Sequence, residues 1–201
     1  MSVCGLDECG RGALAGPLVA AAVVLTTPRQ TISRLAQVKL KDSKLLKPHQ
    51  HRKIYRALVK TGATIRVEVI SHRQINTRGI GWANREIFRR LIHQIEADEY
   101  IADGTLKLGR FNGKSALVHS VINADAIIPA TIAAGIVAKV ERDKLMLALH
   151  KEFPKYGWKT NTGHGTRKHI QAIVDHGSTK YHRSVFVTTA LRNNATRGHH
   201  V

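Results

Sequence analysis

The order of the apolar segments along the chain constrains its fold more than any other feature. Two segments rich in small and β-branched residues, 3–8 and 17–25, come first, and the break at Gly10-Arg11-Gly12 indicates two strands joined by a tight connection. Three further strands are predicted, at 63–70, 100–102 and 116–122. Because these later strands alternate with segments of helical period, the order predicts an α/β fold, a mixed β-sheet flanked by helices.

Helices are predicted where apolar residues recur at steps of three and four. The clearest helix covers residues 79–96, in which three arginines lie on the side opposite the apolar residues. Further helices are predicted at 48–60, 129–150 and 166–176. We expect one domain over residues 1–186, with a helical C-terminal segment from about residue 153, and a basic, mobile tail at 187–201.

The charge of the chain indicates a polyanionic partner. Its 32 lysine and arginine residues against 14 acidic ones give a formal net charge of +18. The basic residues are spread along the whole chain, which favours nucleic acid over an anionic membrane surface. Binding to phosphate backbones should weaken steeply as salt is added.

The cysteines and the apolar segment near the N-terminus indicate where in the cell the protein is located. Cys4 and Cys9 are the only cysteines, and in a strand their separation of about 16 Å excludes a disulfide. This is consistent with a reducing, cytoplasmic setting. The apolar run at 13–25 is too short to span a bilayer, and acidic residues precede it where a signal peptide carries positive charge. No membrane association is expected.

Four carboxylates stand apart from the others because they lie at the ends of predicted strands. Asp7 and Glu8 end the first strand, Asp103 ends another, and Asp125 follows a third. Carboxylates that converge on one rim of a sheet repel each other unless a cation is present. Oxygen ligands without a nearby His or Cys pattern favour Mg²⁺ or Mn²⁺. Two such ions can activate water and stabilise the leaving 3′ oxygen, so that hydrolysis of a phosphodiester needs no protein nucleophile.

Spacing alone leaves a second interpretation open, in which these are scattered strand-end carboxylates. Neighbours in a regular strand point to opposite faces of the sheet. Asp7 and Glu8 can therefore face one ion only if the strand ends or bends beside them, which Gly10 and Gly12 would permit.

Four sequence motifs resemble those of a known family. The stretch GLDECGRGALAGP at residues 5–17 closely resembles the opening signature of the type 2 ribonucleases H, G-[IL]-D-E-A-G-R-G-P-L-A-G-P. Residues 42–44 (DSK) are similar to the family's D-S-K loop, and residues 101–104 (IADG) to its strand-ending D-G. Residues 125–143 resemble the segment G-D-x-x-x-P-x-I-A-A-A-S-I-[LV]-A-K-V-x-R-D. The matches run in family order to about residue 186.

The resemblance implies a ribonuclease H-like fold and an endonuclease that hydrolyses the RNA strand of RNA–DNA hybrids. The products would carry 5′-phosphate and 3′-hydroxyl ends, the cofactor would be Mg²⁺ or Mn²⁺, and the task would include removing ribonucleotides from DNA. The resemblance implies a catalytic, metal-binding set: Asp7, Glu8, Asp103 and Asp125. It implies substrate contacts from a further set: Gly10, Arg11, Gly12, Ser43, Lys44, His164 and Arg183. We expect a monomer whose C-terminal segment closes over the duplex.

Individual roles in the second set differ. The glycines would let the backbone approach the sugar and sense its 2′-hydroxyl. Lys44 would contact phosphate, or would be an ordinary solvated lysine. Arg183 lies in a stretch that partly matches the family's H-R-x-S-F, and we expect it to pack and to contact phosphate.

The largest departure from the family pattern is at position 164. Residues 162–166 read TGHGT where the family usually has G-Y-P-T, so His164 replaces a tyrosine that stacks on the sugar beyond the cut site. Its imidazole can still stack, which leaves two interpretations: a substrate contact, or a loop residue near phosphate. A zinc site from His164 and His169 is set aside, because their spacing is five and no cysteine accompanies them.

Three alternative functions remain at the level of sequence. One is a hybrid-binding protein that has lost the chemistry. Another is a nuclease or transposase on the same sheet that cuts DNA as readily as RNA. The type 3 ribonucleases H are a nearer alternative, disfavoured because the sequence begins at the catalytic strand, without room for their extra N-terminal domain.

Overall fold

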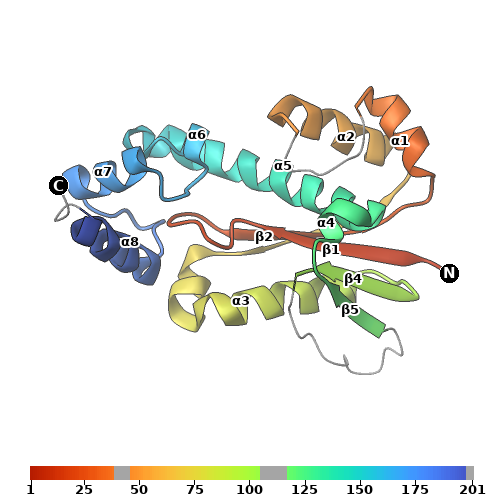
Figure 1. The fold of residues 1–201 in the computed structure, drawn as a ribbon, viewed down its shortest axis with the longest axis horizontal. Coiled ribbons are helices and arrows are strands. Elements are labelled where there is room, and N and C mark those ends of the chain that lie inside the picture. The colour runs from red at the N-terminus through yellow and green to blue at the C-terminus, as the bar shows by residue number, and fades with distance from the viewer. Residues whose placement is uncertain (39–45, 105–116, 198–201) are drawn as a thin grey trace. The chain divides into compact units, whose positions relative to one another are not determined.

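The computed structural model describes residues 1–38, 46–104 and 117–197, and its ribbon is drawn in Figure 1. These residues form two compact units. The sheet unit comprises residues 1–9, 19–69 and 84–141. The C-terminal unit comprises residues 10–18, residues 70–83 and the chain from residue 142 onward.

A five-stranded mixed sheet, in the order β3-β2-β1-β4-β5, is the centre of the sheet unit. Its strands are β1 (Val3–Cys9), β2 (Leu18–Val24), β3 (Thr64–Ile70), β4 (Glu99–Asp103) and β5 (Leu117–Val121). β1 runs antiparallel to β2 and parallel to β4, which in turn is parallel to β5. The predicted mixed sheet is confirmed, with each described strand within two residues of its expected bounds.

Helices cover the sheet of this unit through an apolar core. They are α1 (Arg29–Ala36), α2 (Pro48–Lys60), α4 (Ala124–Ile127), and the parts of α3 (His72–Gln94) and α5 (Pro129–Glu152) that belong to the unit. One core cluster joins β2 with α1, α2 and α5 through Ala21, Val23, Ile32, Ile54, Leu58, Ile132, Ile136 and Val137. Contact between β1 and α5 is so close that a Cβ on Gly5 would lie 2.1 Å from the Ala130 carbonyl carbon. Only glycine fits at this crossing.

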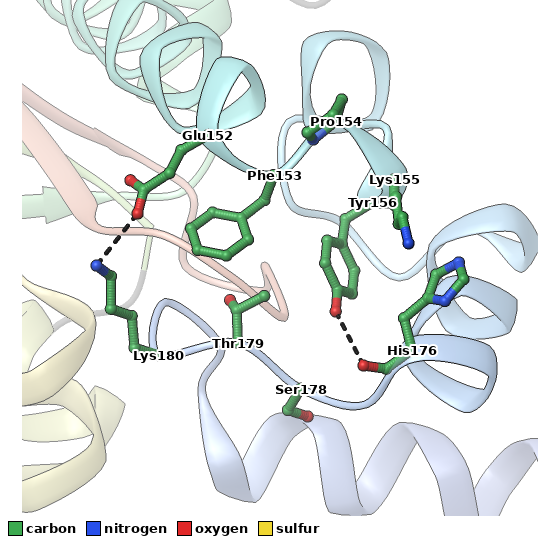
Figure 2. Close-up of a pocket in the computed structure, with 9 residues that line it drawn as sticks. All are labelled: Glu152, Phe153, Pro154, Lys155, Tyr156, His176, Ser178, Thr179 and Lys180. Atoms are coloured by element: carbon green, nitrogen blue, oxygen red, sulfur yellow. Dashed lines mark hydrogen bonds and ion pairs between the residues drawn. The ribbon is translucent and has the colours of Figure 1, made fainter.

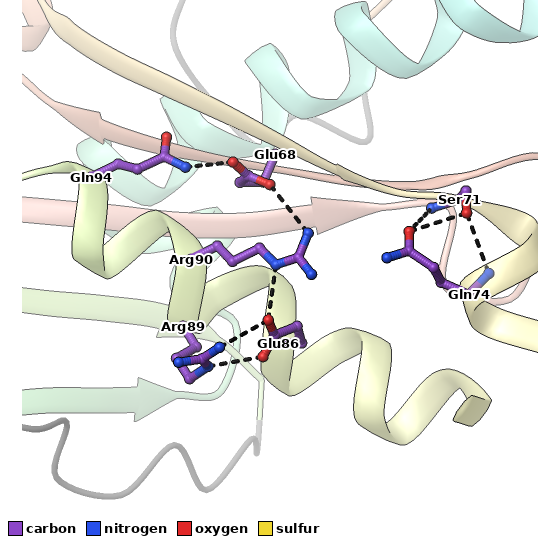
Figure 3. A network of polar contacts seen from close by, with 7 residues as sticks. All are labelled: Glu68, Ser71, Gln74, Glu86, Arg89, Arg90 and Gln94. Atoms are coloured by element: carbon purple, nitrogen blue, oxygen red, sulfur yellow. Dashed lines mark hydrogen bonds and ion pairs between the residues drawn. The ribbon is translucent and has the colours of Figure 1, made fainter. Parts of the chain in front are cut away.

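An ion pair and a hydrogen bond join α3 to β3 on the outside of the sheet unit, beside two ion pairs within α3 (Figure 3). Glu86 accepts hydrogen bonds from Arg89 at 2.8 Å and Arg90 at 2.9 Å, and these bonds lower the pKa of Glu86 to about 2. Arg90 also lies 3.9 Å from Glu68, which accepts a hydrogen bond from Gln94. Such exposed pairs contribute little to stability.

The C-terminal unit has an aromatic core of its own. Its elements are a 3₁₀ turn (Pro154–Tyr156), α6 (Trp158–Asn161), α7 (Arg167–His176) and α8 (Ser184–Arg197). The fully buried Trp158 stacks on Tyr156, with 5.3 Å between ring centroids. An open hollow of about 530 Å³ lies between the end of α5 and the α7–α8 connection, where Lys180 pairs with Glu152 at 3.1 Å (Figure 2).

The structure differs from the sequence prediction in four places. The β1–β2 connection is not tight but covers residues 10–17. α1 was not predicted, because its eight residues are mostly polar and few of them repeat at helical spacing. α3 begins at His72 and is interrupted at Gly79, whose φ of 79° marks the predicted start of its second half. α8 runs through Arg197, where the sequence suggests a tail from residue 187.

Candidate active site

The four predicted carboxylates all lie in the sheet unit, at the same end of neighbouring parallel strands. Asp7 and Glu8 lie near the end of β1, Asp103 ends the adjacent β4, and Asp125 lies in α4, just after β5. Asp125 is 4% exposed, and its amide donates a hydrogen bond to Asp103 Oδ1 at 3.3 Å. Parallel strands bring their carboxyl ends to one edge of a sheet, which is why segments distant in sequence meet here.

The pKa of the Asp7 carboxyl reflects how close these charges are to it. Burial raises the pKa of Asp7 well above its usual range, and the neighbouring Glu8 carboxylate raises it further. Asp103 and Asp125 add to the rise, whereas a hydrogen bond from the Glu8 amide at 2.7 Å opposes it. Carboxylates from three separate segments therefore lie close enough for their charges to act on Asp7. Together with burial, these charges disfavour the ionised form of Asp7.

The carboxylates do not form a finished ligand cluster. Within residues 1–38, 46–104 and 117–197, no group of three or more His, Cys, Asp or Glu side chains is arranged to hold a metal ion. β1 continues to Cys9, so the strand does not end between Asp7 and Glu8, although the Glu8 charge still acts on Asp7. Asp7 faces α5, where a Cβ on Gly135 would lie 2.3 Å from its Oδ2. Gly135 thus leaves the space that this carboxylate occupies.

The predicted glycine motif lies in the C-terminal unit, where a buried arginine organises its loop. Arg142, on α5, is 0% exposed and donates hydrogen bonds to three carbonyl oxygens: Ala15 at 3.2 Å, Pro17 at 3.0 Å and Thr162 at 2.8 Å. It therefore joins the 10–17 loop to the 162–166 loop. Hydrogen bonds to a charged donor are stronger than neutral ones, so each contact constrains the backbone substantially.

Arg183 holds the 10–17 loop at two more carbonyls. Its guanidinium donates to Gly16 at 3.0 Å and to Arg11 at 2.9 Å, and it is 0% exposed. Burial, together with the neighbouring Arg142, lowers the pKa of Arg183 to about 9. In this structure Arg183 packs inside the unit and supports the loop, and its expected phosphate contact stays a prediction.

The loop that carries His164 is joined directly to the glycine loop. Gly163 accepts hydrogen bonds from the amides of Leu14 at 2.8 Å and Ala15 at 3.3 Å. A Cβ on Gly163 would lie 2.4 Å from the Ala15 carbonyl oxygen, and its φ of 84° also requires glycine. The His164 side chain is exposed. The structure thus places Gly10, Arg11, Gly12 and His164 on two loops of one unit that hold each other, with Arg183 in the same unit just before α8.

The two glycines of the motif have different structural demands. Gly10 has a φ of 93°, and a Cβ there would lie 1.9 Å from Arg142 Nε. Gly12 is exposed, and a Cβ there would meet nothing within 4 Å in the described structure. Packing therefore explains Gly10 but not Gly12.

Some residues of the site fall outside these descriptions or were missed. Ser43 and Lys44 lie outside the described residues. Arg142 was not predicted as a site residue, although its i±4 neighbours on α5 are the apolar Ala138 and Met146, which is the signal of a buried arginine. Cys4 and Cys9 both lie in β1 as free thiols. Within the described stretches, no helix is long and apolar enough to cross a membrane.

Solved structures with a similar fold include ribonucleases HII and HIII. The PCNA:RNase HII complex from Archaeoglobus fulgidus contains a chain that matches with a TM-score of 0.76 and 21% identity, over 92% of this chain and 94% of that one. Ribonuclease H2 from Pyrococcus horikoshii matches with a TM-score of 0.74 and 23% identity, over 96% and 98%. Bst-RNase HIII in complex with Mn²⁺ matches at 0.69 and 22%, over 96% and 70%. The fold is therefore ribonuclease H-like.

Sequence relatives decide the family. The family model for ribonuclease HII matches residues 4–189. Ribonuclease HII of Ralstonia pickettii is 38% identical over 92% of this chain and 77% of its own length, and that of Clostridium botulinum is 33% identical over 94% and 69%. The chain belongs to the ribonuclease HII family and is an endonuclease specific for RNA–DNA hybrids.

Proposed function

We propose that this chain removes RNA, including single ribonucleotides, from DNA by a reaction that depends on two divalent cations, Mg²⁺ or Mn²⁺. The products would carry 5′-phosphate and 3′-hydroxyl ends. The observation that carries the proposal is the position of the four carboxylates at the same end of neighbouring parallel strands, where the Asp125 amide lies 3.3 Å from Asp103 Oδ1. Removal of ribonucleotides connects the enzyme to DNA replication and repair.

The residues present fit divalent cations by their chemistry. The proposed ligands are Asp7, Glu8, Asp103 and Asp125, and all four supply hard oxygen donors. Repulsion among them lessens when a cation is bound, because positive charge stabilises each ionised carboxylate. Bound divalent ions supply the Lewis acidity that activates water and stabilises the leaving oxygen.

The chain's own residues position the metal ions and the substrate. β1, β4 and α4 present the carboxylates at one end of the sheet, so the scissile phosphate would lie there. In the C-terminal unit, the exposed Arg11 and Gly12 would contact the backbone around the ribonucleotide, with His164 beside the next sugar. Ser43 and Lys44 would add phosphate contacts. We also predict that the enzyme is cytoplasmic and monomeric and does not bind membranes.

A direct assay tests the proposal. Purified protein is incubated with a labelled RNA–DNA hybrid and with an all-DNA duplex of the same sequence, each with Mg²⁺, with Mn²⁺ or with EDTA. We expect metal-dependent cutting of the hybrid alone, leaving 5′-phosphate ends. Binding without cutting would favour a hybrid-binding protein, and equal cutting of both duplexes a less selective nuclease.

Gly12→Ala is expected to weaken substrate binding without affecting the fold. A Cβ at this position has open space in the protein, so its cost should appear only when a sugar approaches. We expect KM for the hybrid to rise about tenfold, because the variant would lose roughly one hydrogen bond to the substrate. The thermal unfolding temperature should not change. Gly10→Ala is the matched comparison and should destabilise the protein by more than about 2 kcal/mol. An unchanged KM for Gly12→Ala would count against a substrate contact there.

His164→Tyr is expected to favour single ribonucleotides. The wild type and the variant are each assayed on substrates with one and with four embedded ribonucleotides. For each protein, the cleavage rate on one ribonucleotide is divided by the rate on four, and the two ratios are compared. The larger ring should raise the relative rate on the single ribonucleotide about fivefold, since aromatic packing contributes roughly 1 kcal/mol. If His164 is only a loop residue, the ratio will not change.

A further inference from the structure

A buried network of three rings lies in the C-terminal unit. Trp158 and His169 are 0% exposed and His182 is 3% exposed. Trp158 Nε1 lies 3.0 Å from His169 Nε2, and His182 Nε2 lies 3.2 Å from the same His169 atom. None of these residues belongs to the predicted active site.

The partners define which ring nitrogens carry hydrogen. The indole N–H is only a donor, so His169 Nε2 must accept, and its Nδ1 therefore carries the hydrogen. On His182, Nδ1 accepts from the Thr179 amide at 2.9 Å, so Nε2 carries the hydrogen and donates to His169 Nε2, whose one lone pair it shares with the indole N–H. This arrangement satisfies every ring nitrogen only if both imidazoles are neutral. Burial supports this, since it lowers the pKa of His169 and, with His169 close by, the pKa of His182 to about 4.

The remaining hydrogen of His169 is directed at the His164 loop. His169 Nδ1 lies 2.8 Å from the His164 carbonyl oxygen, to which the Thr166 amide also donates at 2.9 Å. The His164 amide donates to the Asn161 carbonyl at 2.9 Å. Both main-chain groups of His164 are therefore held, while its side chain is exposed.

We propose that His169 is a positioning residue for substrate binding: its Nδ1–H fixes the His164 carbonyl, and so the loop presents the His164 side chain to the hybrid from a fixed backbone position. Trp158 and His182 act through His169, because they keep its hydrogen on Nδ1. The inference rests on the proposed contact between this loop and the substrate.

Two substitutions of His169 by amide residues distinguish the role of Nδ1 from that of Nε2. In His169→Asn, the amide nitrogen takes the place of Nδ1 and can still donate to the His164 carbonyl. In His169→Gln, the longer side chain takes the amide to the place of Nε2, where its oxygen accepts from Trp158, and the His164 carbonyl keeps only its bond from the Thr166 amide among the described residues. We expect His169→Gln to raise KM about fivefold to tenfold with kcat within about twofold, the pattern for lost ground-state binding. His169→Asn should keep KM within about twofold of the wild type.

A structural role would give a different result. Both substitutions remove one side of the network and should lower the unfolding temperature by similar amounts. If KM rose equally in both variants, in proportion to the lost stability, the positioning role would be wrong. Nitrogen chemical shifts of the wild-type rings give a test that needs no variant to fold: hydrogen on Nε2 of His169 would also overturn the proposal.

A double-mutant cycle with His164→Ala shows whether His169 acts through His164. If it does, His169→Gln should raise KM little or not at all once the His164 ring is gone. A full additional rise would contradict the inference. If His164→Ala alone leaves KM unchanged, the proposed substrate contact of the loop fails. If it raises KM while His169→Gln does not, only the positioning role fails.

Discussion

Asp7→Asn is expected to reduce hybrid cleavage at least about a thousandfold, because a ligand of the proposed cations supplies several kcal/mol of transition-state stabilisation. The same substitution should make the protein more stable in EDTA. The Asp7 charge is opposed by burial and by Glu8, Asp103 and Asp125, and asparagine removes that charge. Its side-chain oxygen can still accept the hydrogen bond from the Glu8 amide. Activity and stability therefore change in opposite directions.

Two measurements check this prediction: single-turnover cleavage of a labelled hybrid, and thermal unfolding with EDTA and with Mn²⁺. Mn²⁺ should raise the unfolding temperature of the wild type, since a ligand bound to the folded state stabilises it, and should raise that of Asp7→Asn less. Glu99→Gln is the matched control, because Glu99 lies at the opposite end of β4 from Asp103. It should leave cleavage unchanged. Retained cleavage by Asp7→Asn would remove Asp7 from the catalytic set.

The sequence predicts those elements of this fold that have a clear period. α2 begins and ends at its expected residues, because Pro48 marks its start and apolar residues repeat through it. α8 was missed for the opposite reason: it is rich in β-branched residues, which are weak helix formers. It is stabilised by tertiary contacts, with Val187 buried in the C-terminal core and Ala190 and Leu191 packed against it. Helical spacing of these three residues was the available signal.

The functional residues, too, divide into those that the sequence predicts and those that only the fold reveals. Strand-end carboxylates are recognisable because an acid directly after an apolar segment is unusual, and the family motif then gives them roles. The support of the 10–17 and 162–166 loops is harder to predict, because Arg142 and His169 act on main-chain carbonyls. Arg142 contacts two carbonyls that are more than a hundred residues away in the sequence, and His169 contacts one that is five residues away. No side-chain pattern records a contact with a carbonyl oxygen, so the fold is needed to find such residues.

Arg142→Met is expected to cause the largest loss of stability among these substitutions. Methionine fills part of the space but donates nothing, which leaves the carbonyls of Ala15, Pro17 and Thr162 without their charged partner. Each buried acceptor left unsatisfied costs about 1–3 kcal/mol, so the total should reach about 4 kcal/mol or more. Arg142→Lys should restore only part of this, because an ammonium cannot replace the guanidinium fork at three separate acceptors.

Chemical denaturation and amide exchange distinguish this role from a general effect of losing an arginine. Arg89→Met is the matched control, since Arg89 is half exposed and, in the part of the chain that the structure describes, pairs with Glu86 alone (Figure 3). The control should cost no more than about 1 kcal/mol. In Arg142→Met, amides of the 10–17 and 162–166 loops should exchange faster than the rest of the C-terminal unit, because their shared anchor is gone. If the two variants lost equal stability and the loop amides stayed protected, the hydrogen bonds within the loops would be sufficient to hold them, and Arg142 would not be what shapes the proposed substrate-binding surface.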